Sequence, residues 1–423
     1  MRRLLILGAG TAGTMMANKL RPRLDPDEWK ITVVDQDDSH QYQPGYLFIP
    51  FGAYTPEQVV RPRRRFLSPG VEMVIGDIDL VLPDENRVRL AAGQELDYDY
   101  LFIATGTTPR PDQTPGMTGD EWGRSIFEFY TLEGSKALAE KLERWEGGRL
   151  VVHITEMPIK CPPAPLEFAF LADSHFRSRG MRDRVQITFV TPLDGAFTKP
   201  VASRLLGDML DERSIDLEPD FYIERVDNEG KTIVSFDERE VPFDLLVTVP
   251  LNMGADYVAR SGMGDELNYV PVDKHTMVSP RWDNVFAIGD ASDLPTSKAG
   301  SVAHFAAEVL TENFLQHVRG QSMTHSFDGH ANCFVEAGAG KAMLIDFNYD
   351  VEPLPGRYPL PVVGPMTLLA ERRINHWGKL AFRWVYWNAL LPGRRLPVPT
   401  AMSMTGKTQV PAPNTQPDKE TVP

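Results

Sequence analysis

A glycine-rich turn close to the N-terminus constrains the fold of this chain more than any other segment. Residues 8–13 read GAGTAG, and they stand between an apolar run at 3–7 and a helix expected at 12–20. A second expected strand, Ile31–Val34, is followed by Asp35, 22 positions beyond the last glycine of the turn. A strand, a GxGxxG turn, a helix and then an acid at this spacing form the pattern of a dinucleotide-binding fold.

The residues of this pattern have separate tasks in such a fold. Gly8, Gly10 and Gly13 let the backbone approach a pyrophosphate, whose negative charge the N-terminus of the following helix stabilises. Asp35 stands at the end of the second strand, where it can accept hydrogen bonds from ribose hydroxyls. The sequence therefore predicts a bound dinucleotide at this turn.

Two later segments repeat the order of an apolar strand followed by a glycine turn. The run that begins at Tyr98 ends in Thr105 and Gly106, and a second run ends in Gly289 and Asp290. These segments resemble the ATG and GD motifs of the two-dinucleotide-binding-domain flavoproteins. The resemblance implies that the cofactor is FAD, that Asp290 hydrogen-bonds its ribityl chain, and that the FAD domain is split by an insert.

The insert lacks the second glycine-rich turn that a nicotinamide-binding domain would carry. Its expected first strand, 149–154, leads into residues 155–163, which read TEMPIKCPP. Prolines have no backbone N–H to donate to a phosphate, and the carboxylate of Glu156 would repel one. The sequence therefore predicts that NAD(P)H is not the reductant, and Cys161 stands where its phosphates would have lain.

Residues 367–391 form a basic, tryptophan-rich segment in a chain whose net charge is −14. Lys379 and Arg383 are among the bases, which are predicted on faces other than the apolar one. Such a helix is typical of a segment that lies in the headgroup plane of a membrane. The alternative is a helix packed on the core or at a dimer interface. The apolar residues that recur at helical spacing are Ile374, Trp377, Ala381, Trp384 and Val385.

The predicted fold class is α/β, with two Rossmann-like dinucleotide-binding domains, the first split by insertion of the second, and a C-terminal amphipathic membrane-associating segment. There is no run of 18 apolar residues and no signal-peptide pattern, and the acidic balance argues against a nucleic-acid partner. We expect a peripheral protein on the cytoplasmic face of the cell membrane. The predicted boundaries are 1–110 and 275–335 for the FAD domain, 111–274 for the second Rossmann-like domain, 336–402 for the C-terminal membrane segment and 403–423 for a disordered tail.

The chain has two cysteines, Cys161 and Cys333, 172 positions apart, which is too far for a local metal-binding or CxxC motif. Beside a flavin they would form a site for sulfur chemistry, and apart from it they would be ordinary buried thiols. A reactive thiol needs a lowered pKa, for which Lys160 and a helix beginning near Pro165 are the candidates. Glu167 is a candidate general base, or else a first-turn glutamate that is solvated or caps its helix.

Taken together, these motifs resemble the sulfide:quinone oxidoreductase family over the chain up to about residue 400. The resemblance implies that the two cysteines lie on either side of the flavin, are bridged by sulfur during turnover, and form a redox-active pair. It implies sulfide as donor, polysulfide or persulfide sulfur as product, membrane quinone as acceptor, and Lys298 near flavin and quinone. The segments that carry it are 8–13, Pro158–Cys161 with Glu167, Gly289-Asp290, Cys333 and 375–380.

The chain departs from that family at two places. Many members carry a third cysteine where this chain has Phe127, so the route by which sulfur leaves stays open. A related flavocytochrome attaches FAD covalently through a cysteine in the region of residues 40–48, and residues 40–44 contain none, so the flavin is non-covalent or attached elsewhere. Two alternatives also stay open: a type II NADH:quinone oxidoreductase, and a flavin and thiol redox sensor without turnover. Membrane surface lipids and a second copy of the chain are further expected partners, and no metal site is predicted.

Overall fold

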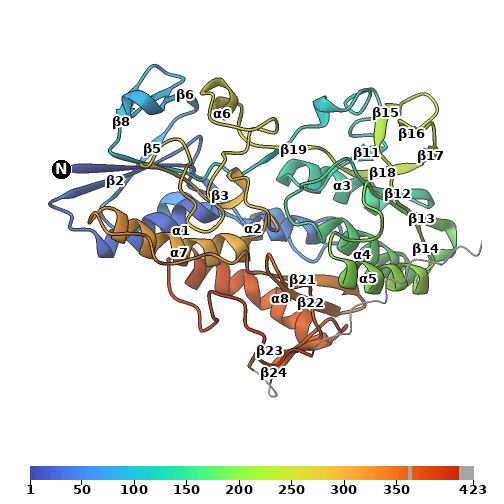
Figure 1. Ribbon diagram of the computed structural model, residues 1–423. Helices are drawn as coiled ribbons and strands as arrows, with labels where there is room; N and C mark the ends of the chain where they lie inside the picture. Colours follow the sequence, from blue (N-terminus) through green and yellow to red (C-terminus); the bar gives the residue numbers. More distant parts are fainter. Residues whose placement is uncertain (361–363, 409–423) are drawn as a thin grey trace, which may run out of the picture.

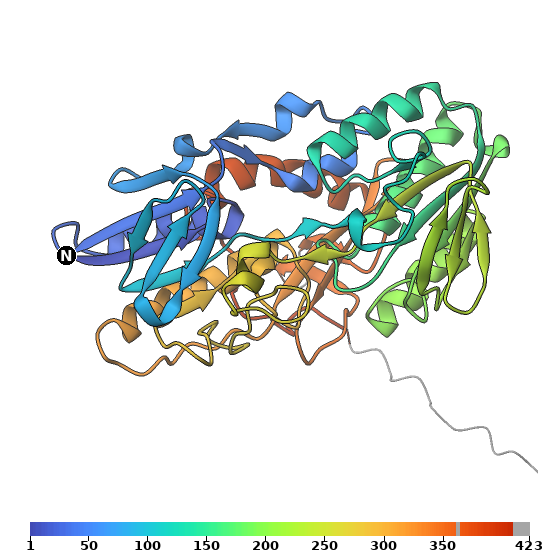
Figure 2. The ribbon, with the colours of Figure 1, turned by 90° about the horizontal axis from the view of Figure 1, so that it is seen from above.

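The computed structural model describes residues 1–360 and 364–408. Two α/β lobes lie side by side, one built around the N-terminal strands and one from the insert (Figure 1). The C-terminal segment runs beneath both of them. Seen from above, the connections between the lobes pass through the centre of the molecule (Figure 2), where β10 (Thr108–Pro109) pairs antiparallel with β19 (Asn252–Met253).

The first lobe contains a parallel sheet with the strand order β20-β9-β1-β2-β5. Helices α1 (Thr11–Leu20) and α7 (Gly300–His317) pack against each other on one face of it. Such sheets are covered on both faces, which explains why β1 reads as a continuous apolar run. The five strands are β1 (Arg2–Leu7), β2 (Trp29–Asp35), β5 (Val71–Ile75), β9 (Tyr100–Ile103) and β20 (Val285–Ala287).

Smaller elements cover the edges of this lobe. A three-stranded antiparallel sheet lies beside α6 (Asp256–Arg260). Its strands are β6 (Ile78–Leu82), β7 (Arg87–Leu90) and β8 (Glu95–Asp97). The segment that leads to β5 contains β3 (Ser39–Gln41), the helical turn η2 (Gln43–Phe48), α2 (Pro56–Val59) and β4 (Val60–Pro62).

The second lobe has its own parallel sheet, in the order β11-β18-β12-β13-β14. The predicted first strand of the insert, 149–154, coincides with β12 to within one residue. The elements of this lobe are β11 (Ile126–Phe127), α3 (Leu132–Arg144), β12 (Gly148–Ile154), α4 (Ala164–Ser178), β13 (Val185–Val190), α5 (Pro200–Glu212), β14 (Ile215–Glu218), β15 (Ile223–Asp227), β16 (Thr232–Ser235), β17 (Glu240–Pro242) and β18 (Leu245–Val249).

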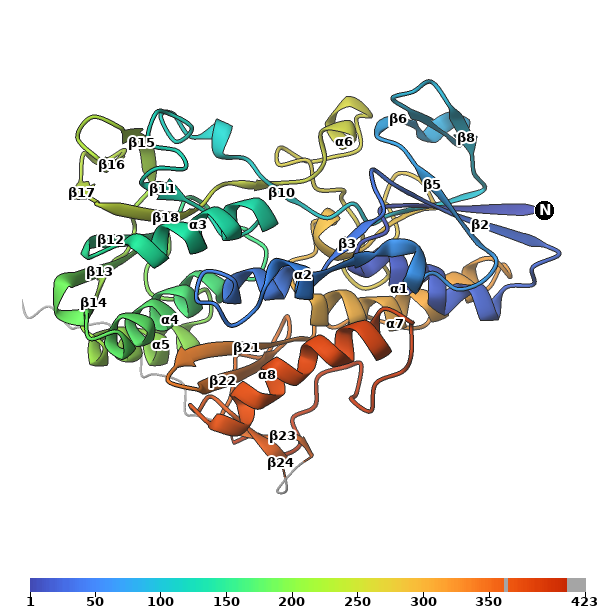
Figure 3. The same ribbon diagram turned by 180° about the vertical axis from the view of Figure 1, so that it is seen from behind.

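The C-terminal segment forms a four-stranded sheet and a helix. The sheet order is β21-β22-β24-β23, and β21 packs on α4 of the second lobe. Helix α8 (Arg373–Val385) crosses β21 and β22 and continues into the helical turn η8 (Tyr386–Leu390), as seen from behind in Figure 3. The strands are β21 (Ala331–Gly338), β22 (Lys341–Phe347), β23 (Gly356–Leu360) and β24 (Gly364–Leu368).

The sheets and the predicted boundaries agree only in part. The first sheet joins strands from both predicted parts of the FAD domain, whereas β21 runs across the predicted border at 335. The boundaries themselves stay a prediction. Residues 403–408 do not form the predicted disordered tail, because Thr408 N donates to Pro355 O at 2.8 Å and Lys407 makes a buried ion pair with Asp346 at 2.5 Å. Residues 409–423 of that predicted tail lie outside the described residues.

Over the described part of the chain, every helix is too short or too polar to cross a bilayer.

Candidate active site

The turn between β1 and α1 has the geometry that a pyrophosphate requires. Gly8 has a φ of +96°, and a Cβ on Gly13 would lie 1.9 Å from the carbonyl oxygen of Gly8. These two glycines therefore let β1 and α1 approach each other. The Cβ position of Gly10 has no atom within 4 Å, and no side chain caps the N-terminus of α1. The first N–H groups of α1 are thus available to an anion beside Gly10.

Asp35, at the end of β2, is held in place by two contacts. It accepts a hydrogen bond from Ala9 N at 2.7 Å and pairs with the guanidinium of Arg63 at 3.1 Å. Burial raises the pKa of Asp35, and the positive charge of Arg63 opposes that shift. Arg63 also donates to Ala9 O at 3.0 Å, so it orders the turn as well as the acid. Sequence reasoning did not single out Arg63, although the run RRR at 63–65 was visible.

The other predicted cofactor residues lie at the ends of β9 and β20. Gly106 and Gly289 both have a φ of +70°, and the Cβ position of Gly106 is open. Thr105 meets Tyr257 at 3.2 Å between their hydroxyl oxygens. Burial raises the pKa of Asp290, while the charges of two lysines oppose the shift. No described side chain donates a hydrogen bond to the Asp290 carboxylate, which is therefore free to bind a polyol hydroxyl.

Lys298 connects this edge of the sheet to α7. Its Nζ donates to Asp290 O at 3.1 Å and Ser292 O at 2.9 Å, and lies 3.7 Å from the centre of the Tyr269 ring. Burial lowers the pKa of Lys298 to about 8, although nearby acids such as Asp290 oppose the change. Helix α7 begins two residues later, and no side chain caps it. Open glycines, a free acid and two uncapped helix N-termini suit a dinucleotide with a flavin ring.

The segment that carries Cys161 is attached to the start of α7. Cys161 has a φ of +49°, its N donates to Lys298 O at 2.7 Å, and its carbonyl accepts from Ala164 N at 2.9 Å. Ala164 is the first residue of α4, so Cys161 links the start of α4 to the segment that leads into α7. The left-handed backbone is unusual for a cysteine and is held by these contacts at both ends.

Cys333 reaches the same place from the other side. It lies on β21, opposite Ile345 of β22, and the preceding carbonyl, Asn332 O, accepts from Ser301 Oγ at 2.7 Å. Ser301 is in the first turn of α7. Both cysteine segments therefore contact residues 298–301, and both thiols are free and half-buried. They are near enough for the charge of a Cys161 thiolate to raise the pKa of Cys333.

The electrostatics of the thiols differ from the prediction. Burial raises the pKa of Cys161 to about 12, and Glu167 adds to the shift. Burial also raises the pKa of Cys333 well above its usual range. Lys160 does not face the sulfur, because its Nζ donates to Gln43 Oε1 at 3.1 Å. The expectation that Lys160 activates Cys161 is therefore wrong, and the cation that favours both thiolates is Lys379.

Glu167 forms a buried ion pair with Lys379. Its side chain is 1% exposed; Oε1 accepts from Glu336 N at 2.6 Å and from Lys379 Nζ. Oε2 is buried and has no hydrogen-bond partner among the described side chains and backbone. Glu167 is therefore neither solvated nor a cap of its own helix, so the two alternatives to a general base that the sequence left open are both wrong. Burial alone would lower the pKa of Lys379, but Glu167 and Glu336 outweigh it and raise that pKa.

Two further residues, Glu336 and His376, connect the Glu167–Lys379 ion pair to the protein surface. Glu336 lies on β21, and its Oε2 is 2.9 Å from Nδ1 of His376, which is partly exposed on α8. Burial raises the pKa of Glu336, and Lys379 opposes this most strongly. The sequence placed Lys379 on a face of the helix other than the apolar one, but it did not indicate that this face is buried against Glu167. His376 and Lys379 are three apart, so they share one face of α8 and point inward together.

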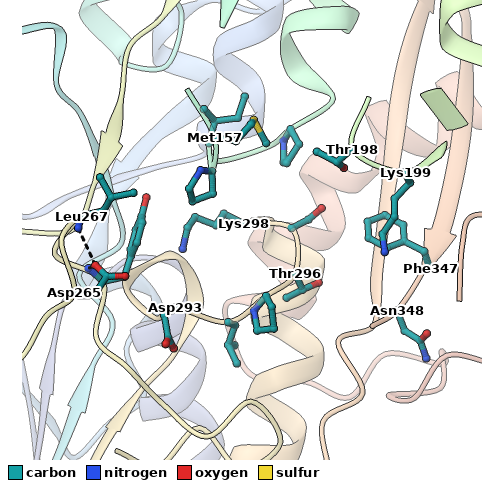
Figure 4. Close-up of a pocket in the computed structure, with 17 residues that line it drawn as sticks. Met157, Thr198, Lys199, Asp265, Leu267, Asp293, Thr296, Lys298, Phe347 and Asn348 are labelled. Carbon is teal, nitrogen blue, oxygen red and sulfur yellow. Dashed lines mark hydrogen bonds between the residues drawn. The ribbon is translucent and has the colours of Figure 1, made fainter. Parts of the chain in front are cut away.

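A pocket of 380 Å³ lies on the outer side of the loop that carries Cys161 (Figure 4). Met157 and Lys298 line it, and Lys199 and Phe347 lie together at another edge. Cys161 itself does not line it. The loop that borders this pocket holds the prolines that replace a phosphate-binding turn.

Three comparisons relate the chain to known proteins. Residues 2–152 match the family described as pyridine nucleotide-disulphide oxidoreductase. The chain is 26% identical over 401 residues to the mitochondrial sulfide:quinone oxidoreductase of Dictyostelium discoideum, covering 93% of this chain and 86% of the relative. It is 28% identical over 414 residues to the mitochondrial sulfide:quinone oxidoreductase of Schizosaccharomyces pombe, covering 91% and 89%.

The fold also has a solved counterpart. The structure of the sulfide:quinone oxidoreductase from Aquifex aeolicus superimposes with a TM-score of 0.75 at 22% sequence identity, covering 92% of each chain. At this identity the likeness concerns the fold, which it confirms as α/β of the pyridine nucleotide-disulphide oxidoreductase type. The resemblance that the motifs indicated is confirmed by these relatives.

Proposed function

We propose that this chain is a flavoprotein that oxidises sulfide at Cys161 and Cys333 and passes two electrons through FAD to a membrane quinone. One observation carries the proposal: two cysteines that are 172 positions apart in sequence both lie against the start of α7, next to Asp290 and Lys298. The relatives named for sulfide and quinone support the choice of substrates.

The residues of the first lobe are suited to hold the cofactor. Gly8, Gly10 and the first turn of α1 would take the pyrophosphate, Asp35 a ribose, and Asp290 the ribityl chain. When bound, FAD accepts two electrons from the sulfur donor and delivers them to the acceptor.

The chemistry of the reaction sets what the protein must do with protons. HS⁻ loses two electrons and one proton to become zero-valent sulfur, and a quinone gains two electrons and two protons. One proton must therefore come from solvent for each sulfide. The free Oε2 of Glu167 can accept the proton of the donor. The ammonium of Lys379 pairs with the carboxylate of Glu167 at this buried position. In this role Glu167 is a general base beside the thiols.

The raised pKa values of Cys161 and Cys333 determine the protonation state of the two thiols. At neutral pH both thiols are in their neutral form, because burial disfavours the thiolate. We propose that the oxidised pair, whose sulfur atoms are bridged, is the form that reacts: HS⁻ forms a bond to one sulfur, the S–S bond to the other breaks, and that sulfur leaves as a thiolate. Phe127, at the position of the missing third cysteine, is buried and offers no sulfur there.

The loop at 155–163 supports sulfide rather than NADH as the donor. Pro158, Pro162 and Pro163 supply no N–H groups where a nicotinamide phosphate would bind. Glu156 in the same loop is exposed and carries the wrong charge.

We also propose that the protein associates peripherally with a membrane through α8. Four of the five residues predicted on the apolar face of that helix are exposed, and both tryptophans are among them. An apolar face that points away from the protein suits the boundary between the headgroups and the acyl chains of a bilayer, and the acyl layer is where the quinone is dissolved. The cytoplasmic face of the cell membrane remains the proposed location.

Anaerobic titration of the flavin absorbance tests the proposal. Sulfide should bleach the bound flavin, and decylubiquinone should restore its colour over many cycles. Cys161→Ser and Cys333→Ser should each abolish sulfide bleaching, and Glu167→Gln should slow it, whereas the exposed control Glu140→Gln should not. Bleaching by NADH but not by sulfide would show that the substrate assignment is wrong. Full sulfide turnover in both cysteine variants would show that the site is wrong.

A further inference from the structure

A second pocket lies on the outer side of α8, away from the thiols. It has a volume of 230 Å³ and is formed where α8 and η8 approach α2 and β4. Figure 3 shows α8 beside α2 on this side of the molecule. The residues that line the pocket are Gln58, Arg61, Leu380, Arg383, Trp384, Trp387 and Asn388.

Two guanidinium groups in this pocket lack a counter-charge. Among the residues that the structure describes, neither Arg61 nor Arg383 makes an ion pair, in a chain with a net charge of −14. Burial lowers the pKa of Arg61, and the charges of Arg65 and Arg383 lower it further. The three arginines are therefore close enough to repel one another. An anion between them would relieve that repulsion.

Aromatic rings hold these two arginines in position. The Arg61 guanidinium carbon lies 4.7 Å from the centre of the Trp387 ring, and that of Arg383 lies 4.3 Å from the centre of the Tyr54 ring. Arg383 also donates to Gln58 Oε1 at 3.1 Å. Stacking occupies the faces of the guanidinium groups and leaves N–H groups at their edges for an anion, and planar guanidinium suits phosphate oxygens.

The pocket is bordered by the exposed apolar face of α8. Trp384, which lines the pocket, is 67% exposed, and Trp377, two turns earlier, is 63% exposed. Ile374 lies on the same face. Tryptophan at the boundary between headgroups and acyl chains has its ring in the apolar layer and its N–H in the polar layer. Cations and exposed indole rings thus occur side by side on one surface.

We propose that this pocket binds the phosphate of a phospholipid headgroup with net negative charge, while Trp377 and Trp384 enter the acyl boundary. The inference rests on the proposed peripheral association of α8 with a membrane and names the lipid class that it selects. The same helix carries Lys379 on its inner face. A headgroup bound in the pocket would therefore hold the outer face of α8 against the bilayer, while the inner face of the same helix contacts the buried Glu167 through Lys379.

Vesicle co-sedimentation of the full-length holoenzyme tests this site. One set of vesicles is pure phosphatidylcholine, and the other contains phosphatidylglycerol. Wild type should prefer the phosphatidylglycerol vesicles. R61Q/R383Q should lower the affinity for them about thirtyfold, from about 1 kcal/mol for each basic residue near an anionic surface. The matched control R124Q/R204Q removes two exposed arginines elsewhere and should retain the preference.

Further measurements separate the possible failures. Sulfide turnover with decylubiquinone in solution should be equal in wild type and R61Q/R383Q, which shows that the variant is folded. Equal vesicle affinity of the two proteins would overturn the headgroup site. If wild type binds neither vesicle, the proposed membrane association is overturned as well, while sulfide turnover is judged on its own. The headgroup site would also be overturned if the protein dimerises and W377A/W384A abolishes the dimer. The same holds if the protein binds inorganic phosphate but no vesicles.

Discussion

The ammonium of Lys379 is the group whose removal tests the buried site most directly. Lys379→Met keeps most of the aliphatic stem and removes the charge that contacts Glu167 and faces Glu336. The side chains of both carboxylates are 1% exposed, so neither can regain water when the lysine is lost. Removing one partner of a buried ion pair costs about 3–5 kcal/mol. We expect this decrease in the free energy of unfolding at about pH 8.

The decrease should depend on pH, and its sign follows from the carboxyl groups. Burial raises the pKa of Glu336 in the folded protein, and Lys379 opposes that rise. Without the lysine, the folded-state pKa rises further above the unfolded value of about 4.3. A raised carboxyl pKa contributes stability at low pH that is lost as the pH rises through the folded pKa. The variant should therefore lose less stability at about pH 5 than at about pH 8.

Urea unfolding at both pH values, followed by tryptophan fluorescence, measures the effect. The double variant Lys379→Met/Glu167→Gln should recover part of the loss, because it removes the stranded charge as well. Lys341→Met, at an exposed position of β22, should change the free energy of unfolding by no more than about 0.5 kcal/mol. A loss below about 1 kcal/mol at both pH values, or a double variant no more stable than the single one, would refute the reasoning.

Three further changes test the rest of the site. Because the pKa of Cys161 is raised to about 12, its alkylation by iodoacetamide in the apoprotein should accelerate about tenfold for each pH unit up to pH 10; a plateau near pH 8 would contradict this. Gly10→Ala should leave the melting temperature of the apoprotein unchanged but weaken FAD retention in gel filtration, whereas Gly13→Ala, whose Cβ would lie 1.9 Å from a carbonyl oxygen, should lower both. Arg63→Gln should weaken FAD retention because Asp35 loses its ion pair, and equal retention in equilibrium dialysis would argue against that role.

The elements of the fold that the sequence predicted are those with a local signal. The turn at 8–13, the helix after it and the strands β1, β2, β9, β20 and β12 follow from glycines, prolines and apolar runs within about a dozen residues. The helix at α8 was also predicted, and so was its apolar face, which the structure leaves exposed. The orientation of its other faces was not predicted, because helical spacing gives the position of a side chain around the axis but not what packs against it.

The sequence by itself predicted a dinucleotide site, because the glycine turn and Asp35 are residue types at short spacing, and its motifs carried the family resemblance that implied FAD and sulfide. Only the tertiary structure decided that Cys161 and Cys333 share the start of α7, and that Lys379 rather than Lys160 faces them. The physical reason is desolvation. Burial sets the thiol pKa values and the strength of the Glu167–Lys379 pair, and burial is produced by contacts among segments hundreds of residues apart.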